Sequence, residues 1–289
     1  MRFLILGKNG MLGRDILDAF HQEDVVALQR DELDICNRED VFEQFMTIQP
    51  DVVINATGYT NVDKAETEPE LANDINGYAV GILAQACREI DATLVHFSSD
   101  YVFSGKQKKG YNEDDLPEPL SAYGRSKALG EHLLMEEMES MNDKQQSEGK
   151  YFLIRTSWLF GKNGPNFVDT MLEQCKKSAK LKVVNDQFGK PTYTVDLAKQ
   201  VLWLLKTHDY PYGIYHITND GVTSWYQYAL EIFRQAGYKV NVVPCKTDDY
   251  KRAAPRPVFS ALNNNLLPAL RPWQEALEEY LTKEKFLNP

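Results

Sequence analysis

The chain has 289 residues, of which 43% are hydrophobic and 26% are charged, a composition typical of a globular protein with a large core. Its net charge of −10 argues against a nucleic-acid-binding protein, because a basic surface supplies most of the affinity for a duplex. No apolar run approaches the roughly 20 residues of a membrane span, no signal segment precedes the first predicted strand, and the four cysteines are widely scattered. We therefore expect a cytoplasmic protein with free thiols that binds no membrane.

Short apolar runs alternate with amphipathic stretches through the first two-thirds of the chain. The apolar runs are Phe3–Leu6, Val25–Leu28, Val52–Ile54, Leu94–Phe97 and Phe152–Ile154. Runs of this kind are typical of strands covered on both faces, as in a parallel sheet. Helical spacing of apolar residues is clearest from about 70 to 90 and from about 122 to 138. The alternation predicts an α/β fold with a doubly wound parallel sheet of Rossmann type.

The last third of the chain is divided by prolines into short elements, which predicts a smaller C-terminal α/β lobe. We assign residues 1–155 to a Rossmann-type domain, and residues 156–193 and 216–289 to the smaller lobe. Residues from about 194 to 215 contain a predicted helix and are expected to return to the first domain. The polar stretch 144–150 is expected to be a surface loop.

A glycine-rich loop follows the first predicted strand and leads into a helical stretch, with the spacing GxxGxxG. Its first glycine allows a tight turn, its second lets the backbone approach a pyrophosphate, and its third lets the helix pack closely on the sheet. The helix N-terminus then faces the anion. We predict that this loop binds a dinucleotide, with an ordinary glycine-rich turn as the alternative. The predicted cofactor residues here are Gly7, Gly10, Met11, Leu12 and Gly13.

The end of the second predicted strand bears on the choice between the two nicotinamide cofactors. An arginine there accommodates a 2′-phosphate, whereas a carboxylate usually holds the ribose 2′-hydroxyl. Arg30 therefore favours NADPH, while Asp31 keeps NADH open. Asp34 and Ile35 are candidate contacts for adenine, with a plain loop role for Asp34 as an equal alternative.

Polar side chains that suit carbonyl chemistry follow the fourth apolar run. Ser98 and Ser99 come at its carboxyl end, where open α/β sheets bind ligands. Tyr123 and Lys127 are four residues apart, which places them on one face of a helix. A neighbouring cation is expected to lower the pKa of the phenol, so that tyrosine exchanges protons near neutral pH. The alternatives are turn-capping serines and an exposed helix pair without function.

In this order, the motifs resemble those of the extended short-chain dehydrogenase/reductases. Six segments are more specifically similar to the dTDP-4-dehydrorhamnose reductase family, and they span nearly the whole chain. The segments are NATGYTNVDKAE (55–66, like NAAAYTAVDKAE), SDYVF (99–103, like STDYVFDG), YGRSKALGE (123–131, like YGKTKLAGE), RTSWLFG (155–161, like RTSWVYG), DQFGKPT (186–192, like DQ-GxPT) and RPVFSAL (256–262, like RPxxSxL).

The resemblance implies roles for individual residues. Ser99 takes the position of the family's threonine and retains its hydroxyl, Tyr123 is the general acid, and Lys127 supports it. Asn76 matches an asparagine that helps to order a proton-relay water in the wider superfamily. The further residues expected at the cofactor are Ala56, Thr57, Gly58, Tyr59, Ser98, Tyr123 and Lys127. The residues expected at the sugar nucleotide are Ser99, Asp100 and Trp158, together with Arg256, whose guanidinium suits a diphosphate.

The implied reaction is the reduction of the 4-keto group of a dTDP-4-dehydro-6-deoxy-L-sugar by NADPH, giving dTDP-L-rhamnose for a polysaccharide. Ser99 would hydrogen-bond the carbonyl oxygen and Tyr123 would protonate it. Lys127 would stabilise the phenolate and grip the nicotinamide ribose. Family members can form homodimers around magnesium through an acidic residue after the glycine loop. Asp15 has that place, but its partners are not identifiable, so no metal site is assigned.

Two alternative functions stay open on the sequence. A related sugar-nucleotide epimerase would need a site that rebinds its keto intermediate, a property that the sequence does not report. A dehydratase is less compatible, because Asp100 and Tyr101 follow Ser99 where dehydratases carry an Asp-Glu pair. The chain also resembles the non-catalytic β subunit of methionine adenosyltransferase, which holds NADP. Retention of Ser99, Tyr123 and Lys127 favours an enzyme.

Overall fold

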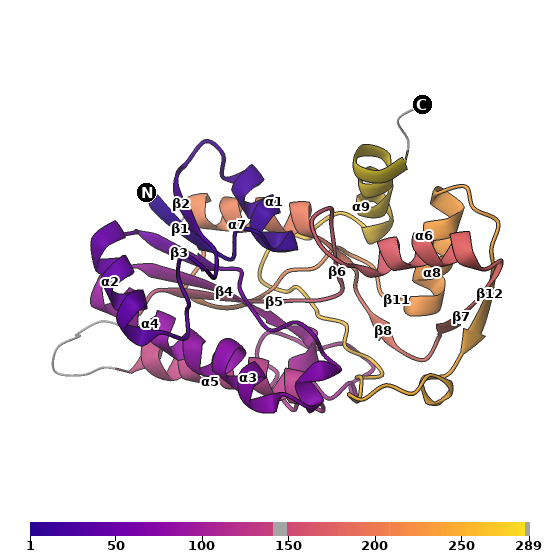
Figure 1. The fold of residues 1–289 in the computed structure, drawn as a ribbon, viewed down its shortest axis with the longest axis horizontal. Helices are drawn as coiled ribbons and strands as arrows, with labels where there is room; N and C mark the ends of the chain where they lie inside the picture. The colour runs from indigo at the N-terminus through magenta and orange to yellow at the C-terminus, as the bar shows by residue number, and fades with distance from the viewer. Residues whose placement is uncertain (141–148, 208, 287–289) are drawn as a thin grey trace.

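The structure is a computed structural model that describes residues 1–140, 149–207 and 209–286. Six parallel strands form its central sheet, in the order β2-β1-β3-β4-β5-β10 (Figure 1). Their bounds are β1 Arg2–Leu6, β2 Asp24–Leu28, β3 Val52–Asn55, β4 Thr93–Ser99, β5 Tyr151–Thr156 and β10 Gly213–His216. The predicted doubly wound fold is therefore confirmed, and all five apolar runs are strands.

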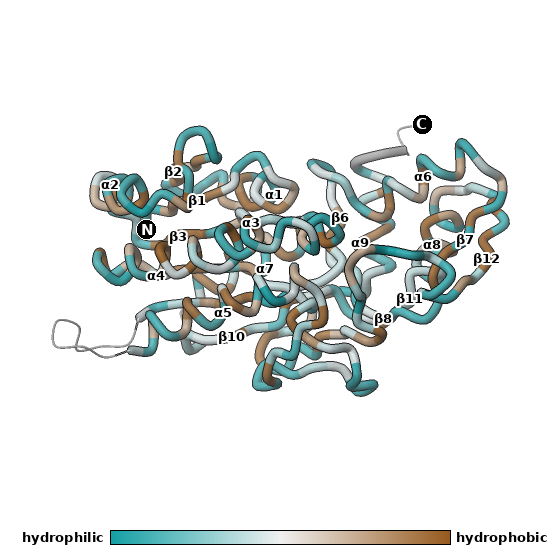
Figure 2. Tube along the Cα trace, turned by 60° about the horizontal axis from the view of Figure 1, so that its bottom comes forward, coloured by the Kyte–Doolittle hydropathy of each residue, from teal (hydrophilic) through white to brown (hydrophobic). Residues whose placement is uncertain are grey.

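Helices cover both faces of this sheet. On one face lie α1 (Met11–Ala19) and α7 (Thr194–Thr207), and on the other lie α2 (Arg38–Ile48), α4 (Ala79–Glu89) and α5 (Ala122–Glu139) (Figure 1). In β1, Phe3 and Ile5 pack toward α1 and α7, whereas Leu4 and Leu6 pack toward the opposite helices. Burial on both faces is the reason that the strand reads as a continuous apolar run. Hydrophobic residues accordingly concentrate along the inner strands and hydrophilic ones in the outer turns (Figure 2).

The helical pattern predicted from about 70 to 90 is interrupted by a π turn. It consists of α3 (Pro69–Asn73), the π segment η2 (Asp74–Tyr78) and α4. This turn packs against α5 so closely that a side chain at Gly130 would place its Cβ 2.0 Å from the Asn76 carbonyl oxygen. Because π turns are enriched at functional sites, the packing of η2 against α5 indicates a candidate functional site in this region.

The C-terminal part builds a second, smaller core. Its longer elements are α6 (Phe167–Lys177), β7 (Lys180–Val184), α8 (Trp225–Gln235), β12 (Asn241–Cys245) and α9 (Trp273–Tyr280). β7 and β12 pair in parallel, and the helices pack around aromatic residues such as Phe160 and Tyr228. Figure 1 shows this part beside the carboxyl ends of the sheet strands, where the glycine loop follows β1 and where β4 ends.

Short elements connect these parts. They are β6 (Leu159–Phe160), β8 (Phe188–Gly189), β9 (Thr192–Tyr193), β11 (Thr223–Ser224), η1 (Lys64–Glu66), η3 (Asp100–Val102), η4 (Thr247–Asp249) and η5 (Leu281–Phe286). The chain returns to the sheet through α7, which packs on α1, and β10, which pairs with β5.

The predicted domain boundaries stay a prediction. Most of the expected loop, residues 144–148, lies outside the described residues, and among the described helices none is long and apolar enough to span a membrane.

Candidate active site

The glycine loop adopts the geometry that its spacing predicts. Gly7 has a φ of +86°, in the left-handed region, and its carbonyl oxygen accepts a hydrogen bond of 3.0 Å from the Gly10 amide. A Cβ at Gly13 would lie 2.1 Å from the same oxygen, so only glycine lets α1 pack this closely on the loop. Gly10 is the N-cap of α1, which points the amino end of the helix at the loop.

A cavity of about 740 Å³ opens beside this loop, at the point where the strand order reverses between β1 and β3. Such switch points are where open α/β sheets bind nucleotides. Predicted cofactor residues that line it are Gly7, Gly10, Arg30, Asp34, Ile35, Ala56, Thr57 and Gly58. Five further lining residues were not predicted, although each is a neighbour in sequence or structure of one that was: Asn9, Gln29, Leu33, Cys36 and Ile75. The predicted residues outside this lining are Met11, Leu12, Gly13, Tyr59, Ser98, Tyr123 and Lys127.

Arg30 stands at the mouth of this cavity with a largely exposed side chain. Its Nη2 lies 4.0 Å from Asp34 Oδ2, a loose contact that leaves the guanidinium accessible. Asp31 lines the same cavity. Arg30 and Asp31, the two residues that bear on the choice between NADPH and NADH, therefore both line the cavity in which a ribose would bind.

The three predicted catalytic residues converge from β4 and α5. Ser99 ends β4, and its hydroxyl donates to Asp100 Oδ1 at 3.0 Å and accepts from the Tyr101 amide at 3.2 Å. The hydroxyl of Ser121 caps α5 by accepting from the Gly124 amide, which starts the helix immediately before Tyr123. Tyr123 reaches the Ser99 hydroxyl, and its ring packs edge-on against Tyr101 at 5.6 Å between centroids. A hydroxyl and a phenol thus lie together beyond the carboxyl end of β4.

The expected lowering of the tyrosine pKa by lysine is wrong for this arrangement. Burial raises the pKa of Tyr123 to about 12, and the hydrogen bond with Ser99 offsets only part of that shift. Lys127 points away toward the Phe97 carbonyl oxygen, to which its Nζ donates at 2.6 Å. Burial lowers the pKa of Lys127 to about 8, while Glu131 acts in the opposite direction. The phenol is therefore protonated at neutral pH, as a general acid must be.

Asp100 is buried beside Ser99. Its Oδ2 accepts a hydrogen bond of 2.5 Å from Ser260 Oγ, and burial raises its pKa to about 7 against the lowering effect of Ser260 and Ser99. Ser260 belongs to the RPVFSAL segment, so this contact joins two of the recognised motifs. Asn76 is equally enclosed, since its Nδ2 donates to the Tyr59 carbonyl and to Ser126 Oγ. The proton-relay role of Asn76 stays a prediction, and both amide hydrogens already have partners.

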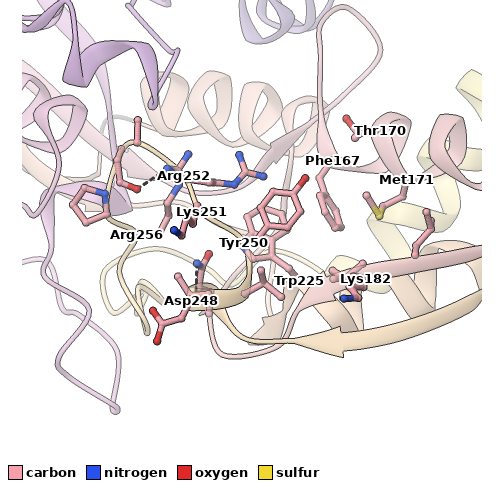
Figure 3. A pocket seen from close by; sticks show the side chains of 18 of the residues that line it. Phe167, Thr170, Met171, Lys182, Trp225, Asp248, Tyr250, Lys251, Arg252 and Arg256 are labelled. Atoms are coloured by element: carbon pink, nitrogen blue, oxygen red, sulfur yellow. Dashed lines mark hydrogen bonds between the residues drawn. The ribbon is translucent and has the colours of Figure 1, made fainter.

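A second, larger cavity of about 1070 Å³ lies beyond Tyr101, among η4, α6 and β7. Apolar and aromatic residues line one part of it and basic residues another. Figure 3 shows Arg252 and Arg256 on one side of Tyr250, and Phe167 and Met171 on the other. Of the residues that line this cavity, only Arg256 was predicted. The basic cluster of residues 251–256 is a signal that could also have indicated Lys251 and Arg252.

Arg256 is held by the first part of the chain. Its Nη1 and Nη2 donate to the two carboxylate oxygens of Asp63, at 2.5 and 2.7 Å. This ion pair, with the Ala254 amide, holds the pKa of Asp63 well below its usual range. Arg256 also hydrogen-bonds Tyr101, the neighbour of Tyr123. The predicted diphosphate-binding arginine thus stands between the larger cavity and the candidate catalytic residues.

Trp158 is outside the lining of the larger cavity but supports it. Its ring stacks on Trp225 with centroids 3.5 Å apart and an interplanar angle of 8°, and Trp225 lines the cavity. The backbone of Trp158 has a φ of +46°, which is unusual for a bulky residue. Trp225 was missed because nothing in the local sequence brings it near Trp158.

The structure gives no support for magnesium at Asp15. This carboxylate is buried between α1 and α7, where Thr194 Oγ1 donates to it. Within residues 1–140, 149–207 and 209–286, no group of three or more histidine, cysteine, aspartate or glutamate side chains could hold a metal ion. A dimer bridged through Asp15 would require this buried side chain to leave its partner.

The reversed strand order, the glycine loop at the start of α1, and the group of Ser99, Tyr123 and Lys127 define an extended short-chain dehydrogenase/reductase. The model of the RmlD substrate binding domain family matches residues 1–286, and the chain belongs to that family. The resemblance read from the six sequence segments is therefore confirmed.

Individual relatives agree with this assignment. The spore coat polysaccharide biosynthesis protein SpsK of Bacillus subtilis is 38% identical over 97% of this chain and 96% of its own. A dTDP-4-dehydrorhamnose reductase of Clostridium acetobutylicum has a TM-score of 0.91 at 40% identity, covering 97% of this chain and 98% of its own. The dTDP-4-dehydrorhamnose reductase of Bacillus anthracis, in complex with NADP, has a TM-score of 0.90 at 37% identity, covering 98% and 99%.

Proposed function

We propose that this chain is an NADPH-dependent oxidoreductase that reduces the 4-keto group of dTDP-4-dehydrorhamnose to give dTDP-L-rhamnose, for polysaccharide biosynthesis. The observation that carries the proposal is the packing of Tyr123 on both sides: its ring contacts Tyr101, which lines the larger cavity, and it shares a hydrophobic cluster with Tyr59, the neighbour of Gly58 in the lining of the cavity at the glycine loop. The names of the full-length relatives support the substrate, since they are dTDP-4-dehydrorhamnose reductases that match nearly the whole chain.

The cofactor fits the smaller cavity. We place NADP with its pyrophosphate at the glycine loop and the N-terminus of α1, and its adenosine part toward Arg30 and Ile35. The accessible guanidinium of Arg30 suits the 2′-phosphate, and the NADP complex of the Bacillus anthracis relative supports the same choice over NADH. Bound NADPH would supply the hydride.

The residues of the chain then act on the carbonyl oxygen. Ser99 would turn its one hydroxyl hydrogen from Asp100 Oδ1 to this oxygen as negative charge develops there, and Tyr123 would donate the proton. Burial, which raises the pKa of Tyr123 to about 12, keeps that proton on the phenol until the oxygen needs it. Lys127 would stabilise the phenolate that is left once its Nζ turns from the Phe97 carbonyl oxygen toward Tyr123.

We place the sugar nucleotide in the larger cavity. Arg252 and Arg256 would hold the diphosphate, because guanidinium groups match phosphate oxygens in geometry and charge. Trp225, stacked on Trp158, offers a flat apolar face to the base. Asp100 would lie near the sugar. In this assignment residues 1–155, with about 194–215, bind the cofactor, and residues 156–193 and 216–289 bind the substrate. A cytoplasmic site of action suits the free cysteines, and a homodimer stays a prediction.

Incubation of the purified chain with NADPH and dTDP-4-dehydro-6-deoxy-L-mannose tests this function. A reductase oxidises one NADPH for each dTDP-L-rhamnose that forms, which absorbance and chromatography measure together. An epimerase would change the sugar without net loss of NADPH. A regulatory NADP-binding subunit would bind the cofactor and leave the keto sugar unchanged. Either of the last two results would overturn the proposal.

A further inference from the structure

A buried chain of hydrogen bonds connects the smaller cavity with Lys127. Thr57 lines that cavity, and its amide and hydroxyl both donate to Asn55 Oδ1, at 3.1 and 2.5 Å. Asn55 Nδ2 lies 3.0 Å from His96 Nδ1, and His96 Nε2 lies 3.4 Å from Lys127 Nζ. Asn55 on β3 and His96 on β4 are direct partners in the sheet register, which holds the two side chains together.

The order of donors and acceptors in this chain fixes the state of the imidazole. Only an oxygen accepts from both Thr57 donors, so the amide nitrogen of Asn55 must face His96. An amide nitrogen donates, and His96 Nδ1 therefore accepts and carries no proton. Burial and the charge of Lys127 hold the pKa of His96 well below its usual value, which keeps the ring neutral. Its one proton must then be on Nε2, directed at Lys127.

An N–H group that points at Lys127 treats its two protonation states differently. It repels an ammonium but donates to the lone pair of an amine. The other titratable group that acts on Lys127 is Glu131 on α5, which raises the pKa of Lys127 and itself forms a bidentate ion pair with Arg155 on β5. His96 is therefore the polar neighbour that favours the loss of a proton from Lys127. The low pKa of Lys127 agrees with this arrangement.

We propose that His96 is a positioning residue for Lys127: Asn55 and Thr57 lock its imidazole in the Nε2–H tautomer, which favours the neutral amine of Lys127 over its ammonium. This inference rests on the proposed reductase function. It assigns roles to His96 and Asn55 that the recognised motifs do not give them.

The tautomer is measurable in the unmodified protein, without any need for turnover. Nitrogen-15 spectra of histidine-labelled protein distinguish a protonated ring nitrogen from a bare one, and His96→Phe identifies the signals. We expect a bare Nδ1 and a protonated Nε2 between about pH 6 and 9. A proton on Nδ1, or an imidazolium, would overturn the proposal whether or not the chain reduces the keto sugar.

An isosteric substitution tests the effect on Lys127. In Asn55→Asp the second carboxylate oxygen accepts from His96 Nδ1–H, which reverses the tautomer and turns the Nε2 lone pair toward the ammonium. The limb of the pH profile of kcat/KM that belongs to Lys127, expected near pH 8, should move to higher pH by about one unit.

A control separates this effect from the added negative charge. The double variant Asn55→Asp with His96→Phe keeps the new carboxylate but has no imidazole to reverse, so we expect most of the shift to disappear relative to His96→Phe alone. An equal shift in both backgrounds would mean that His96 does not transmit the effect. That result would overturn the role of His96 and leave the reductase function intact.

Discussion

Burial sets the chemistry of Tyr123 more than its lysine neighbour does. A phenol with a pKa raised to about 12 is a weak acid in the resting protein. It becomes a useful one only when hydride transfer creates an alkoxide that is more basic than the phenolate. Burial lowers the pKa of Lys127 to about 8, and its Nζ donates to the Phe97 carbonyl oxygen. The two side chains are therefore not a pre-ionised pair in the resting protein.

The substitution Tyr123→Phe should lower kcat by about 10²- to 10⁴-fold, since it removes the proton donor. The ring stays packed on Tyr101, so the melting temperature and the Kd for NADPH should hardly change. Stopped-flow oxidation of NADPH with the keto sugar, together with cofactor titration, measures both. Tyr228→Phe is the matched control, because it removes a buried hydroxyl without a hydrogen-bond partner in the described structure and should keep full turnover. Normal turnover by Tyr123→Phe would exclude it as the acid.

Arg30→Ala should raise the KM for NADPH about tenfold or more and leave the KM for NADH within about twofold, because only NADPH has the 2′-phosphate that the guanidinium would bind. Steady-state kinetics with both cofactors measure the ratio. Arg125→Ala, on an exposed arginine outside both cavities, provides the control. Equal losses with both cofactors would assign Arg30 to general cofactor attraction instead.

Individual site residues differ in how well the sequence predicts them. Ser99, Tyr123 and Lys127 were found because each stands in a motif with fixed spacing along a strand end or a helix. His96 and Asn55 meet only because β3 and β4 pair in one register, which no local spacing records. The lowered pKa of Lys127 was also beyond the sequence, because it depends on burial and on the opposing charge of Glu131.

The predicted elements of the sheet were recovered because each strand is buried on both faces and therefore reads as an apolar run. β10 was not recognised as a strand, since Gly213–His216 contains a glycine and a histidine and owes its conformation to pairing with β5. The π turn at Asp74–Tyr78 was missed for a different reason. One extra residue in a turn hardly changes the helical spacing of the apolar residues, and the close packing of Gly130 on Asn76 is a tertiary contact.

The junction between β1 and α1 allows a test with two alanine substitutions three residues apart. Gly13→Ala puts a Cβ 2.1 Å from the Gly7 carbonyl oxygen, so the loop or helix must shift, and we expect a loss of about 1–3 kcal/mol in the free energy of unfolding. At Gly10 the nearest atom would be 3.4 Å from a new Cβ, and the backbone has a negative φ. Gly10→Ala should therefore fold normally but bind NADPH weakly, because its methyl group occupies the approach to the pyrophosphate.

Urea unfolding and cofactor titration of both variants separate stability from binding. Gly237→Ala is a control for stability alone, because no atom within 4 Å would meet its Cβ and the cost would come from its φ of +73°. If Gly10→Ala binds NADPH as tightly as the parent chain, the pyrophosphate does not pass this glycine.

The two parts of the chain are joined at the larger cavity by the pair of Asp63 and Arg256. Asp63 follows β3 in the first part, and Arg256 lies in the C-terminal segment that forms the basic wall of the cavity. The same carboxylate accepts from the Ala254 amide at 3.1 Å and contacts Arg252 at 3.4 Å. One side chain of the proposed cofactor-binding part thus orders the proposed diphosphate-binding wall, and its loss should affect substrate affinity more than cofactor affinity.

Asp63→Asn should lower the free energy of unfolding at neutral pH by about 1.5–3 kcal/mol, since it leaves a mostly buried guanidinium without its anion. The KM for the sugar nucleotide should rise, while the Kd for NADPH stays the same. The pKa of Asp63 is lowered in the folded state by the hydrogen bond with Arg256, so its stabilising effect is present above the unfolded pKa of about 4 and lost as pH falls below it. The difference in the free energy of unfolding between parent and variant should therefore shrink in acid.

Asp248→Asn makes the same chemical change on the exposed wall of the cavity and should alter the free energy of unfolding by less than about 0.5 kcal/mol. If both variants are equally stable at neutral pH, Asp63 does not join the two parts.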